Sequence, residues 1–362
     1  MTSLPRLPVL EERVETLEKC VYCPKLCRAA CPVSNAEPSE TLTPWGKMSM
    51  AYFAARGDVP IDVEHAAPAW ACTGCFGCRE RCDHKNDVSA TLNVARAELR
   101  ARGAHPPGAT RGLERAREVE AALPEAARAL GGDPNATAAL VVGCGYLTRE
   151  AAVARQAKAV AEALLGRSVR VVDKCCGLPA LHAGDEPGFR RSAAALAEDV
   201  ATASDVVVVD PGCARALQVE YGRAGVSVIG SRLLVDLAYA NESRFTSVGG
   251  APPRYHDACQ LGRGLGRFEE PRRLLERVAG APPAEFERAR ERADCSGAGG
   301  MLPFTFPEAS RGAARARALE HERLGGGTVV TGCASSLRRL RAAGANAEDL
   351  VTWLARGLGL EG

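Results

Sequence analysis

Two short runs of cysteines near the N-terminus constrain this sequence more than any other feature. Together they hold eight of the 15 cysteines, first Cys20, Cys23, Cys27 and Cys31, then Cys72, Cys75, Cys78 and Cys82. Two or three residues separate neighbouring cysteines, and Pro32 follows the first run directly. Such spacing lets a loop surround one face of a [4Fe–4S] cube while the last cysteine reaches a second cube. The pattern therefore predicts two cubane clusters in an electron carrier.

Structural zinc and disulfides are the alternatives to iron–sulfur clusters. Zinc sites usually join two CxxC pairs a dozen or more residues apart, whereas the two runs here span only 12 and 11 residues. A disulfide scaffold is disfavoured by the odd cysteine count and by the length of 362 residues. The sequence shows no secretory signal. We therefore expect a cytoplasmic protein with reduced thiols, which would reach the inner membrane only peripherally, through a partner.

The overall composition excludes several classes of protein. The hydrophobic fraction of 46% and the charged fraction of 25% are typical of a globular chain with room for two or three domains. A formal net charge of +2 gives no basic surface for nucleic acid. No apolar run approaches the roughly 20 residues that cross a bilayer. We expect protein partners, no nucleic acid and no direct membrane span.

The first hundred residues are predicted to form a helical ferredoxin domain, residues 1–103. Helical patterns cover 8–19, 44–56 and 88–102, and strand signals are few. In two-cluster modules the fourth cysteine of each run serves the other cluster. We therefore assign one cube to Cys20, Cys23, Cys27 and Cys82, and the other to Cys31, Cys72, Cys75 and Cys78. Residues 104–136, which contain helix-breaking Pro and Gly on either side of a polar helix, are predicted to be a linker.

From residue 137 onward, short apolar strands alternate with helices. Strands are expected at 138–143, 169–172 and 206–209, and helices at 149–165 and 189–202. This alternation predicts parallel sheets covered by helices. Cysteines follow the strands, and sites in such sheets form beyond the carboxyl ends of the strands. The predicted metal ligands of this part are Cys144, Cys175, Cys176, Cys213, Cys259, Cys295 and Cys333.

The same arrangement of cysteines occurs twice. Cys175 and Cys295 are 120 residues apart, as are Cys213 and Cys333. The repeat predicts two tandem α/β units, which we place at 137–248 and 249–362. The predicted fold class is therefore α+β multidomain, a helical two-cluster domain followed by two α/β repeats with mainly parallel sheets. The alternative is that these are buried structural cysteines in two unrelated sheets.

These motifs resemble a known group of proteins. Two ferredoxin-type runs followed by paired cysteine-rich CCG domains are similar to the D subunit of heterodisulfide reductase and to the iron–sulfur subunits of glycolate oxidase and anaerobic glycerol-3-phosphate dehydrogenase. The resemblance covers Cys20 to about Leu340 and is most specific at Cys175-Cys176-Gly177 and in the interval from Cys295 to Cys333. It implies a ferredoxin domain that exchanges electrons with a redox centre in the CCG repeats, beside a flavoprotein dehydrogenase or a membrane quinone-linked partner.

The CCG motifs here depart from the pattern of that family. Ala216 and Ser336 stand where the final cysteines are expected, and Ser296 replaces the second cysteine of the second repeat. The first repeat keeps four thiols, enough for one cluster or one zinc. The second keeps three, and His256 or Asp257 could supply a fourth ligand. His256 is equally well explained as a core histidine, which is the interpretation we favour.

Three functional hypotheses follow. The first is an electron-transfer subunit between a flavin dehydrogenase, acting on a 2-hydroxy acid or similar substrate, and a quinone or disulfide acceptor. The second is a catalyst that reduces a disulfide at the CCG site, which the missing cysteines disfavour. The third is a ferredoxin domain joined to CCG repeats that hold structural zinc. In all three, the N-terminal runs bind two [4Fe–4S] clusters, and the repeats could hold a third cluster, zinc or no metal.

Overall fold

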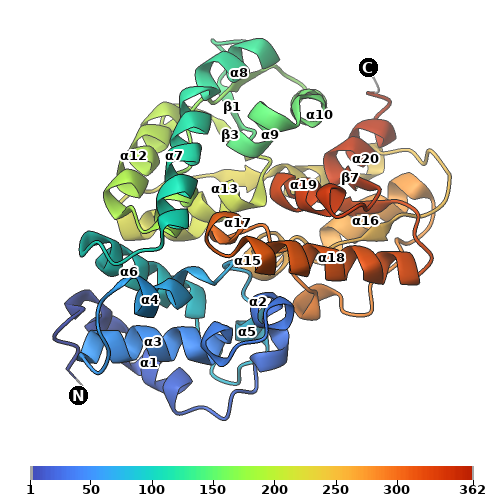
Figure 1. The fold of residues 1–362 in the computed structure, drawn as a ribbon. Coiled ribbons are helices and arrows are strands. Elements are labelled where there is room, and N and C mark those ends of the chain that lie inside the picture. Colours follow the sequence, from blue (N-terminus) through green and yellow to red (C-terminus); the bar gives the residue numbers. More distant parts are fainter. Residues whose placement is uncertain (1–2, 361–362) are drawn as a thin grey trace. The chain divides into compact units, whose positions relative to one another are not determined.

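The structure is a computed structural model that describes residues 3–360. The chain forms two compact units, each built from three segments, and Figure 1 follows the path of the chain through them. Unit 1 comprises Met1–Ala116, Pro179–Gly188 and Glu291–Leu319. Unit 2 comprises Arg117–Leu178, Phe189–Arg290 and Glu320–Gly362. Each predicted α/β repeat thus contributes one short segment to unit 1.

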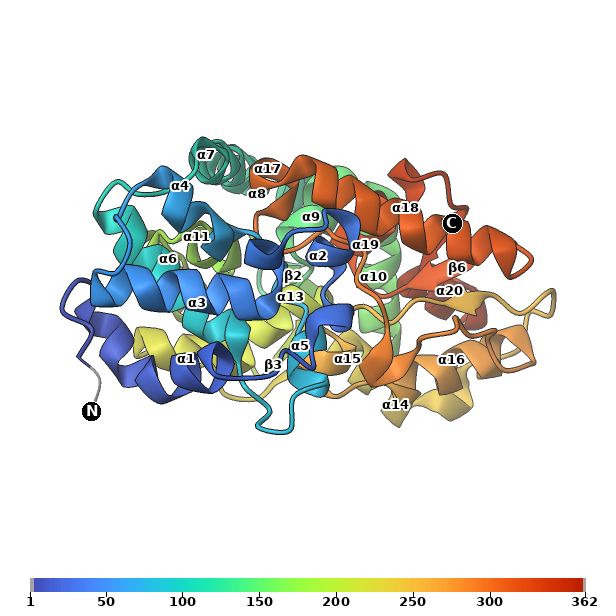
Figure 2. The same ribbon diagram turned by 60° about the horizontal axis from the view of Figure 1, so that its bottom comes forward.

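Unit 1 is helical. Its helices are α1 (Val14–Val21), α2 (Pro32–Ala36), α3 (Pro44–Arg56), α4 (Val63–Ala66), α5 (Gly77–Glu80), α6 (Val88–Ala101) and α17 (Leu302–Thr305). Most of α7 (Pro107–Ala121), α11 (Leu178–Ala183) and α18 (Pro307–Arg323) also belongs to it. Helices α1 and α3 lie side by side, as Figures 1 and 2 both show. They enclose a core that includes Leu17, Met48 and Trp70.

Helix α3 illustrates how the sequence determines an element that carries part of the site. Thr43 caps its N-terminus, since the Thr43 hydroxyl accepts a 3.0 Å hydrogen bond from the Gly46 backbone N–H. Pro44 occupies the first turn, where no backbone donor is needed. Gly57 ends the helix with a φ of 94°, a conformation that glycine adopts without strain. The helix spans Pro44–Arg56, as predicted.

Unit 2 contains two parallel sheets. The first has the order β2-β1-β3-β4, from β1 (Ala138–Val141), β2 (Val169–Val171), β3 (Asp205–Val208) and β4 (Ser231–Leu233). The second has the order β5-β6-β7, from β5 (Arg254–Tyr255), β6 (Val329–Thr331) and β7 (Ala347–Asp349). In the register of the first sheet, Ala138 pairs with both Val169 and Asp205. The buried valines of β1 and β3 form the centre of this sheet.

Helices pack on both sheets of unit 2. They are α8 (Leu123–Leu130), α9 (Cys144–Arg149), α10 (Ala151–Leu165), α13 (Pro211–Arg215), α14 (Leu234–Ala240), α15 (Gly262–Leu265), α16 (Glu269–Ala279), α19 (Ala334–Ala342) and α20 (Leu350–Gly357), together with most of α12 (Glu186–Val200). Helix α10 of the first repeat packs against α20 of the second, and α20 also packs against α16.

The observed architecture confirms the predicted fold class. A helical N-terminal part is joined to two repeats with parallel sheets. The predicted helix at 88–102 is α6, and the strands predicted at 138–143 and 206–209 are β1 and β3 within two residues at either end. Among residues 3–360, no helix combines the length and the apolar character that crossing a membrane requires.

Candidate iron–sulfur sites

The structure brings the cysteines of the two N-terminal runs together in two groups. The first thiol group contains Cys20, Cys23, Cys27 and Cys82. Burial raises the pKa of Cys20 to about 12, and the neighbouring thiols of Cys27, Cys82 and Cys23 add to that rise. Burial likewise raises the pKa of Cys27 to about 11, with Cys23 and Cys82 as its nearest electrostatic neighbours. Because charge repulsion weakens with distance, the thiols of Cys23, Cys27 and Cys82 lie within electrostatic range of Cys20.

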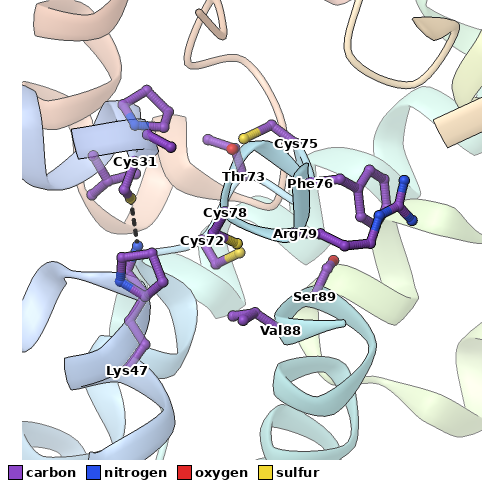
Figure 3. Close-up of a pocket in the computed structure, with 14 residues that line it drawn as sticks. Cys31, Lys47, Cys72, Thr73, Cys75, Phe76, Cys78, Arg79, Val88 and Ser89 are labelled. Atoms are coloured by element: carbon purple, nitrogen blue, oxygen red, sulfur yellow. Dashed lines mark hydrogen bonds between the residues drawn. The ribbon is translucent and has the colours of Figure 1, made fainter. Parts of the chain in front are cut away.

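The second thiol group contains Cys31, Cys72, Cys75 and Cys78. All four line one cavity with Lys47, as Figure 3 shows. Cys72 and Cys75 lie on a tight loop in which Gly74 and Phe76 have φ values of 67° and 60°, and Cys78 lies on α5, which follows it. Burial raises the pKa of Cys78 well above its ordinary value, and the thiols of Cys72, Cys75 and Cys31 raise it further. The last cysteine of each run thus lies with the first three cysteines of the other run.

Polar side chains from α3, α6 and the loop before α6 hold the sulfurs and their loops. Asn86 Nδ2 donates to Cys20 Sγ at 3.0 Å and to the Thr16 carbonyl at 2.8 Å. Lys47 Nζ donates to Cys31 Sγ at 3.3 Å. The buried guanidinium of Arg96 donates through Nη2 to the Cys72 carbonyl at 3.0 Å. Hydrogen bonds to ligand sulfurs and to their backbone are the interactions by which proteins orient and tune a cluster.

The two groups fit [4Fe–4S] clusters by the chemistry of their donors. Each supplies four sulfurs, and a thiol must lose its proton to bind iron. Burial and mutual repulsion oppose that loss in the protein alone, with pKa values of about 12 at Cys20 and about 11 at Cys27. Iron would provide the compensating positive charge. Within residues 3–360, no three His, Cys, Asp or Glu side chains are arranged around a single metal ion.

A third thiol group lies at the carboxyl edge of the first sheet in unit 2. It contains Cys144, Cys175, Cys176 and Cys213, which follow β1, β2 and β3. Neighbouring side chains are hydrogen-bonded in the order Cys144–Cys175–Cys176–Cys213. The hydrogen bond with Cys176 lowers the pKa of Cys213, but burial and the nearby Asp210, Cys144 and Cys175 together outweigh it, and the pKa is about 12. The strand topology thus gathers thiols up to 69 residues apart in the sequence (213 − 144).

A buried aspartate holds the backbone beside the third thiol group. Asp210 caps α13, and its Oδ1 accepts hydrogen bonds from the N–H groups of Gly212, at 2.8 Å, and Cys213, at 3.4 Å. Burial raises the pKa of Asp210, although the backbone donors of Gly212, Cys213 and Ala334 oppose that rise. Because Ala334 follows Cys333, Asp210 also joins the cysteine loop of the first repeat to that of the second.

The three cysteines of the second repeat are divided between the units. Cys259 and Cys333 belong to unit 2, whereas Cys295 belongs to unit 1. Cys295 Sγ lies 3.8 Å from the Thr73 hydroxyl, on the loop of the second thiol group. Gly299 and Gly300 follow the same loop so closely that a Cβ at Gly300 would lie 1.9 Å from the Cys72 carbonyl oxygen. The segment from Cys295 to Gly300 therefore belongs structurally to the ferredoxin-like unit.

The two residues considered as a fourth ligand in the second repeat have other partners. Asp257 accepts a pair of hydrogen bonds from Arg272, at 2.8 and 2.9 Å, and a third from the Arg290 backbone at 2.9 Å. His256 is buried and packs edge-on against Phe286 at a ring distance of 6.2 Å. These contacts favour structural roles for both side chains.

Several residues that support the thiol groups escaped sequence reasoning, namely Lys47, Asn86, Arg96, Asp210 and the buried pair Tyr146 and Asp349. Lys47 offered one usable signal. It lies one α-helical turn before Ala51 and two turns before Ala54 on the closely packed face of α3. A lysine aligned with small buried residues indicates a buried charge, and a buried charge needs a partner.

Comparisons with known proteins match the same segments. Residues 16–86 match the family model described as a 4Fe-4S dicluster domain, and residues 138–218 and 254–340 match the one described as a cysteine-rich domain. The chain is 27% identical to the B subunit of fumarate reductase (CoM/CoB) of Methanothermobacter marburgensis over 344 residues, 88% of this chain and 66% of that protein. It is 27% identical to the D subunit of dihydromethanophenazine:CoB–CoM heterodisulfide reductase of Methanosarcina mazei over 211 residues, 52% of this chain and 50% of that protein.

A third relative shares a shorter region. EtfAB:quinone oxidoreductase of Syntrophomonas wolfei is 30% identical over 140 residues, 37% of this chain and 20% of that protein. The chain therefore spans about two thirds of the fumarate reductase protein and half or less of the other two. The matched segments contain all 15 cysteines, and they support iron–sulfur clusters as the cofactors.

Proposed function

We propose that this chain, which belongs to the iron–sulfur proteins with cysteine-rich CCG domains, is an electron-transfer subunit of an oxidoreductase complex. The observation that carries the proposal is the pair of four-thiol groups in unit 1. Each group takes one cysteine from the other run, so two clusters would be held within one fold. Two clusters in one fold suit the transfer of single electrons, which needs no acid or base from the protein.

The cluster ligands that we propose are the first and second thiol groups. A bound [4Fe–4S] cluster accepts and releases one electron, at a potential set by burial, hydrogen bonds to sulfur and local charge. The chain itself supplies the four sulfurs of each site, the Asn86 and Lys47 donors and the Arg96 hydrogen bond to the ligand loop. We retain 1–103 as the ferredoxin domain, 104–136 as the linker, and 137–248 and 249–362 as the CCG repeats.

The third thiol group is the proposed site of an additional centre. Its four sulfurs suffice for one cluster or one zinc. The segment from Cys295 to Gly300, which packs on the loop of Cys72 and Thr73, is a structural link between the second repeat and the second thiol group. Structural zinc in the repeats is the second candidate on donor chemistry alone, because four cysteine thiols are also the ligand set of a structural zinc site.

The donor and acceptor are proposed by their chemistry. The named relatives include one protein of a fumarate reductase, one of a heterodisulfide reductase and a quinone oxidoreductase. We propose a flavoprotein dehydrogenase, acting on a 2-hydroxy acid or similar metabolite, as the electron donor. A quinone or a disulfide would be the acceptor. Direct disulfide reduction at the CCG site is the less favoured alternative, because Ala216 and Ser336 replace the final cysteines.

A redox cycle tests the proposal. The anaerobically purified protein is reduced with dithionite, monitored by EPR, and then mixed with an excess of a water-soluble quinone. We expect two cluster signals that appear on reduction and disappear on reoxidation, over repeated cycles without loss of iron. The matched control is a double variant with one serine substitution in each thiol group, Cys27→Ser with Cys75→Ser. A native protein whose clusters cannot be reduced and reoxidised would contradict the electron-transfer role.

A further inference from the structure

Lys47 is a buried cation that donates to a cysteine sulfur. Its side chain projects from α3 into the cavity of the second thiol group (Figure 3), and the residue is 2% exposed. Within residues 3–360, the polar partner of its ammonium is Cys31 Sγ at 3.3 Å, and no Asp or Glu pairs with it. Burying an ammonium without a negative partner is strongly unfavourable. The surroundings must therefore supply negative charge, and the sulfurs are the groups in position to do so.

The first thiol group has a neutral donor instead. There the Asn86 amide donates to Cys20 Sγ at 3.0 Å, and Asn86 is also held by the Thr16 carbonyl at 2.8 Å. An amide contributes a dipole, whereas an ammonium contributes a full charge. The two thiol groups thus differ in the electrostatics of a side chain that donates to a ligand sulfur.

The difference has a predictable effect on electron affinity. Adding an electron to a cluster makes it more negative, so a fixed positive charge nearby stabilises the reduced form. The effect is strong at a buried site, because little solvent screens the charge. Burial alone has the opposite effect, since it disfavours the more highly charged reduced form. The ammonium of Lys47 would offset that effect at the second thiol group.

We propose that Lys47 is a tuning residue that raises the reduction potential of the cluster held by Cys31, Cys72, Cys75 and Cys78. The proposal rests on the proposed function, because it requires that cluster to be present. It assigns to this chain a means of setting the two clusters at different potentials. An added electron would then reside preferentially on the cluster with the higher reduction potential, within unit 1.

The test is a potentiometric titration followed by EPR. The variants Lys47→Met, which removes charge and donor, and Lys47→Gln, which keeps a neutral donor, are compared with the native protein. We expect the midpoint of one cluster signal to move to a more negative potential in both variants, further in Lys47→Met, while the other signal stays in place. Lys47→Arg, which keeps the charge, should restore part of the native potential.

The matched control is Lys85→Met. This substitution removes the same charge from a side chain that is 61% exposed and pairs with Glu80 at 3.1 Å, so solvent screening should leave both midpoints unchanged. Unchanged midpoints in both neutral Lys47 variants, or loss of the second cluster in all three Lys47 variants, would overturn the tuning role. Fewer than two cluster signals in the native protein would instead refute the proposed function itself.

Discussion

The Tyr146 hydroxyl donates a 2.7 Å hydrogen bond to Asp349 Oδ2, and both side chains are buried. Tyr146 lies on α9, two residues after Cys144, and Asp349 ends β7 and caps α20 through the Val351 N–H at 2.9 Å. The bond therefore joins the cysteine loop of the first repeat to the second sheet. It provides one polar connection inside a core that is otherwise largely apolar.

This pair predicts a pH dependence of stability. Burial raises the pKa of Asp349 to about 7, although the Tyr146 hydrogen bond opposes that rise. An unfolded aspartate releases its proton near pH ~4. Between these values the folded protein binds one more proton than the unfolded chain, so the free energy of unfolding falls as the pH rises from about 4 to 7.

The variant Asp349→Asn tests this effect, since an amide can keep the cap and a hydrogen bond with Tyr146 while it cannot ionise. We expect its free energy of unfolding at about pH 8 to exceed that of the native protein by up to a few kcal/mol, at about 1.4 kcal/mol per pKa unit. At about pH 4 the two should be equal, because the native carboxyl is then protonated in the folded protein. Melting curves followed by circular dichroism at both pH values measure this difference in the free energy of unfolding. If the difference between the two proteins is the same at both pH values, the role of Asp349 is refuted.

The crossed ligand arrangement predicts which substitutions act alike. Cys31→Ser and Cys75→Ser come from different runs, yet both should remove the same cluster signal and about four irons, the content of one cubane. Cys20→Ser and Cys82→Ser should remove the other signal. EPR with iron analysis of the four variants decides the question. If Cys31→Ser instead removes the signal that Cys20→Ser removes, the ligands are not crossed.

The close packing at Gly300 predicts a local effect on the second cluster. A Cβ there would lie 1.9 Å from the Cys72 carbonyl oxygen, and the φ of +65° already disfavours other residues. Gly300→Ala should therefore displace the ligand loop and weaken the second cluster signal. Gly266→Ala is the matched control, because Gly266 has a φ of +75° but no atom within 4 Å of the added Cβ.

Gly266→Ala should lower the free energy of unfolding only by the roughly 1–2 kcal/mol that a left-handed conformation costs a residue other than glycine. Iron content and melting temperature are measured for both variants. Equal melting temperatures, with both cluster signals intact in Gly300→Ala, would show that the segment from Cys295 to Gly300 does not support the ligand loop.

Asp257 is predicted to stabilise the fold rather than bind metal. Its carboxylate is held by both terminal nitrogens of Arg272 in a buried pair. Asp257→Asn should leave the iron and zinc content unchanged and lower stability, by up to about 3–5 kcal/mol for a broken buried ion pair. Glu285→Gln, which alters the half-exposed partner of the same arginine, should lower the free energy of unfolding by less than Asp257→Asn does. Loss of metal from Asp257→Asn without a change in melting temperature would assign Asp257 as a ligand.

Local sequence signals predicted much of the fold. The run of valines at 206–209 predicts β3, and Thr43, Pro44 and Gly57 bound α3 on chemical grounds. The strands β4 and β7 were not predicted, because three residues such as Ser231–Leu233 carry no apolar alternation and pair only through tertiary contact. Cys31, Cys72, Cys75 and Cys78, grouped from cysteine spacing, line one cavity, and their assignment as cluster ligands stays a prediction.

The sequence did not predict those features of the sites that depend on contacts between residues far apart in the chain. The 120-residue repeat places Cys295 in the second CCG segment, in agreement with the family match over residues 254–340. The repeat does not indicate that this segment also packs within unit 1. In the structure Cys295 belongs to unit 1, because Gly299 and Gly300 allow its loop to approach Thr73 and Cys72. The burial of Lys47 also depends on loops that are up to 31 residues away in sequence (78 − 47).

The metal and sulfide content of the anaerobically purified protein tests the central claim most directly. Two cubanes predict about eight irons and eight sulfides per chain, with two EPR signals on reduction. About twelve irons with a third signal would place a further redox centre in the repeats, and about eight irons with one zinc would make the repeats a scaffold. Zinc without sulfide would contradict the account, because the first two thiol groups would then hold no redox cofactor.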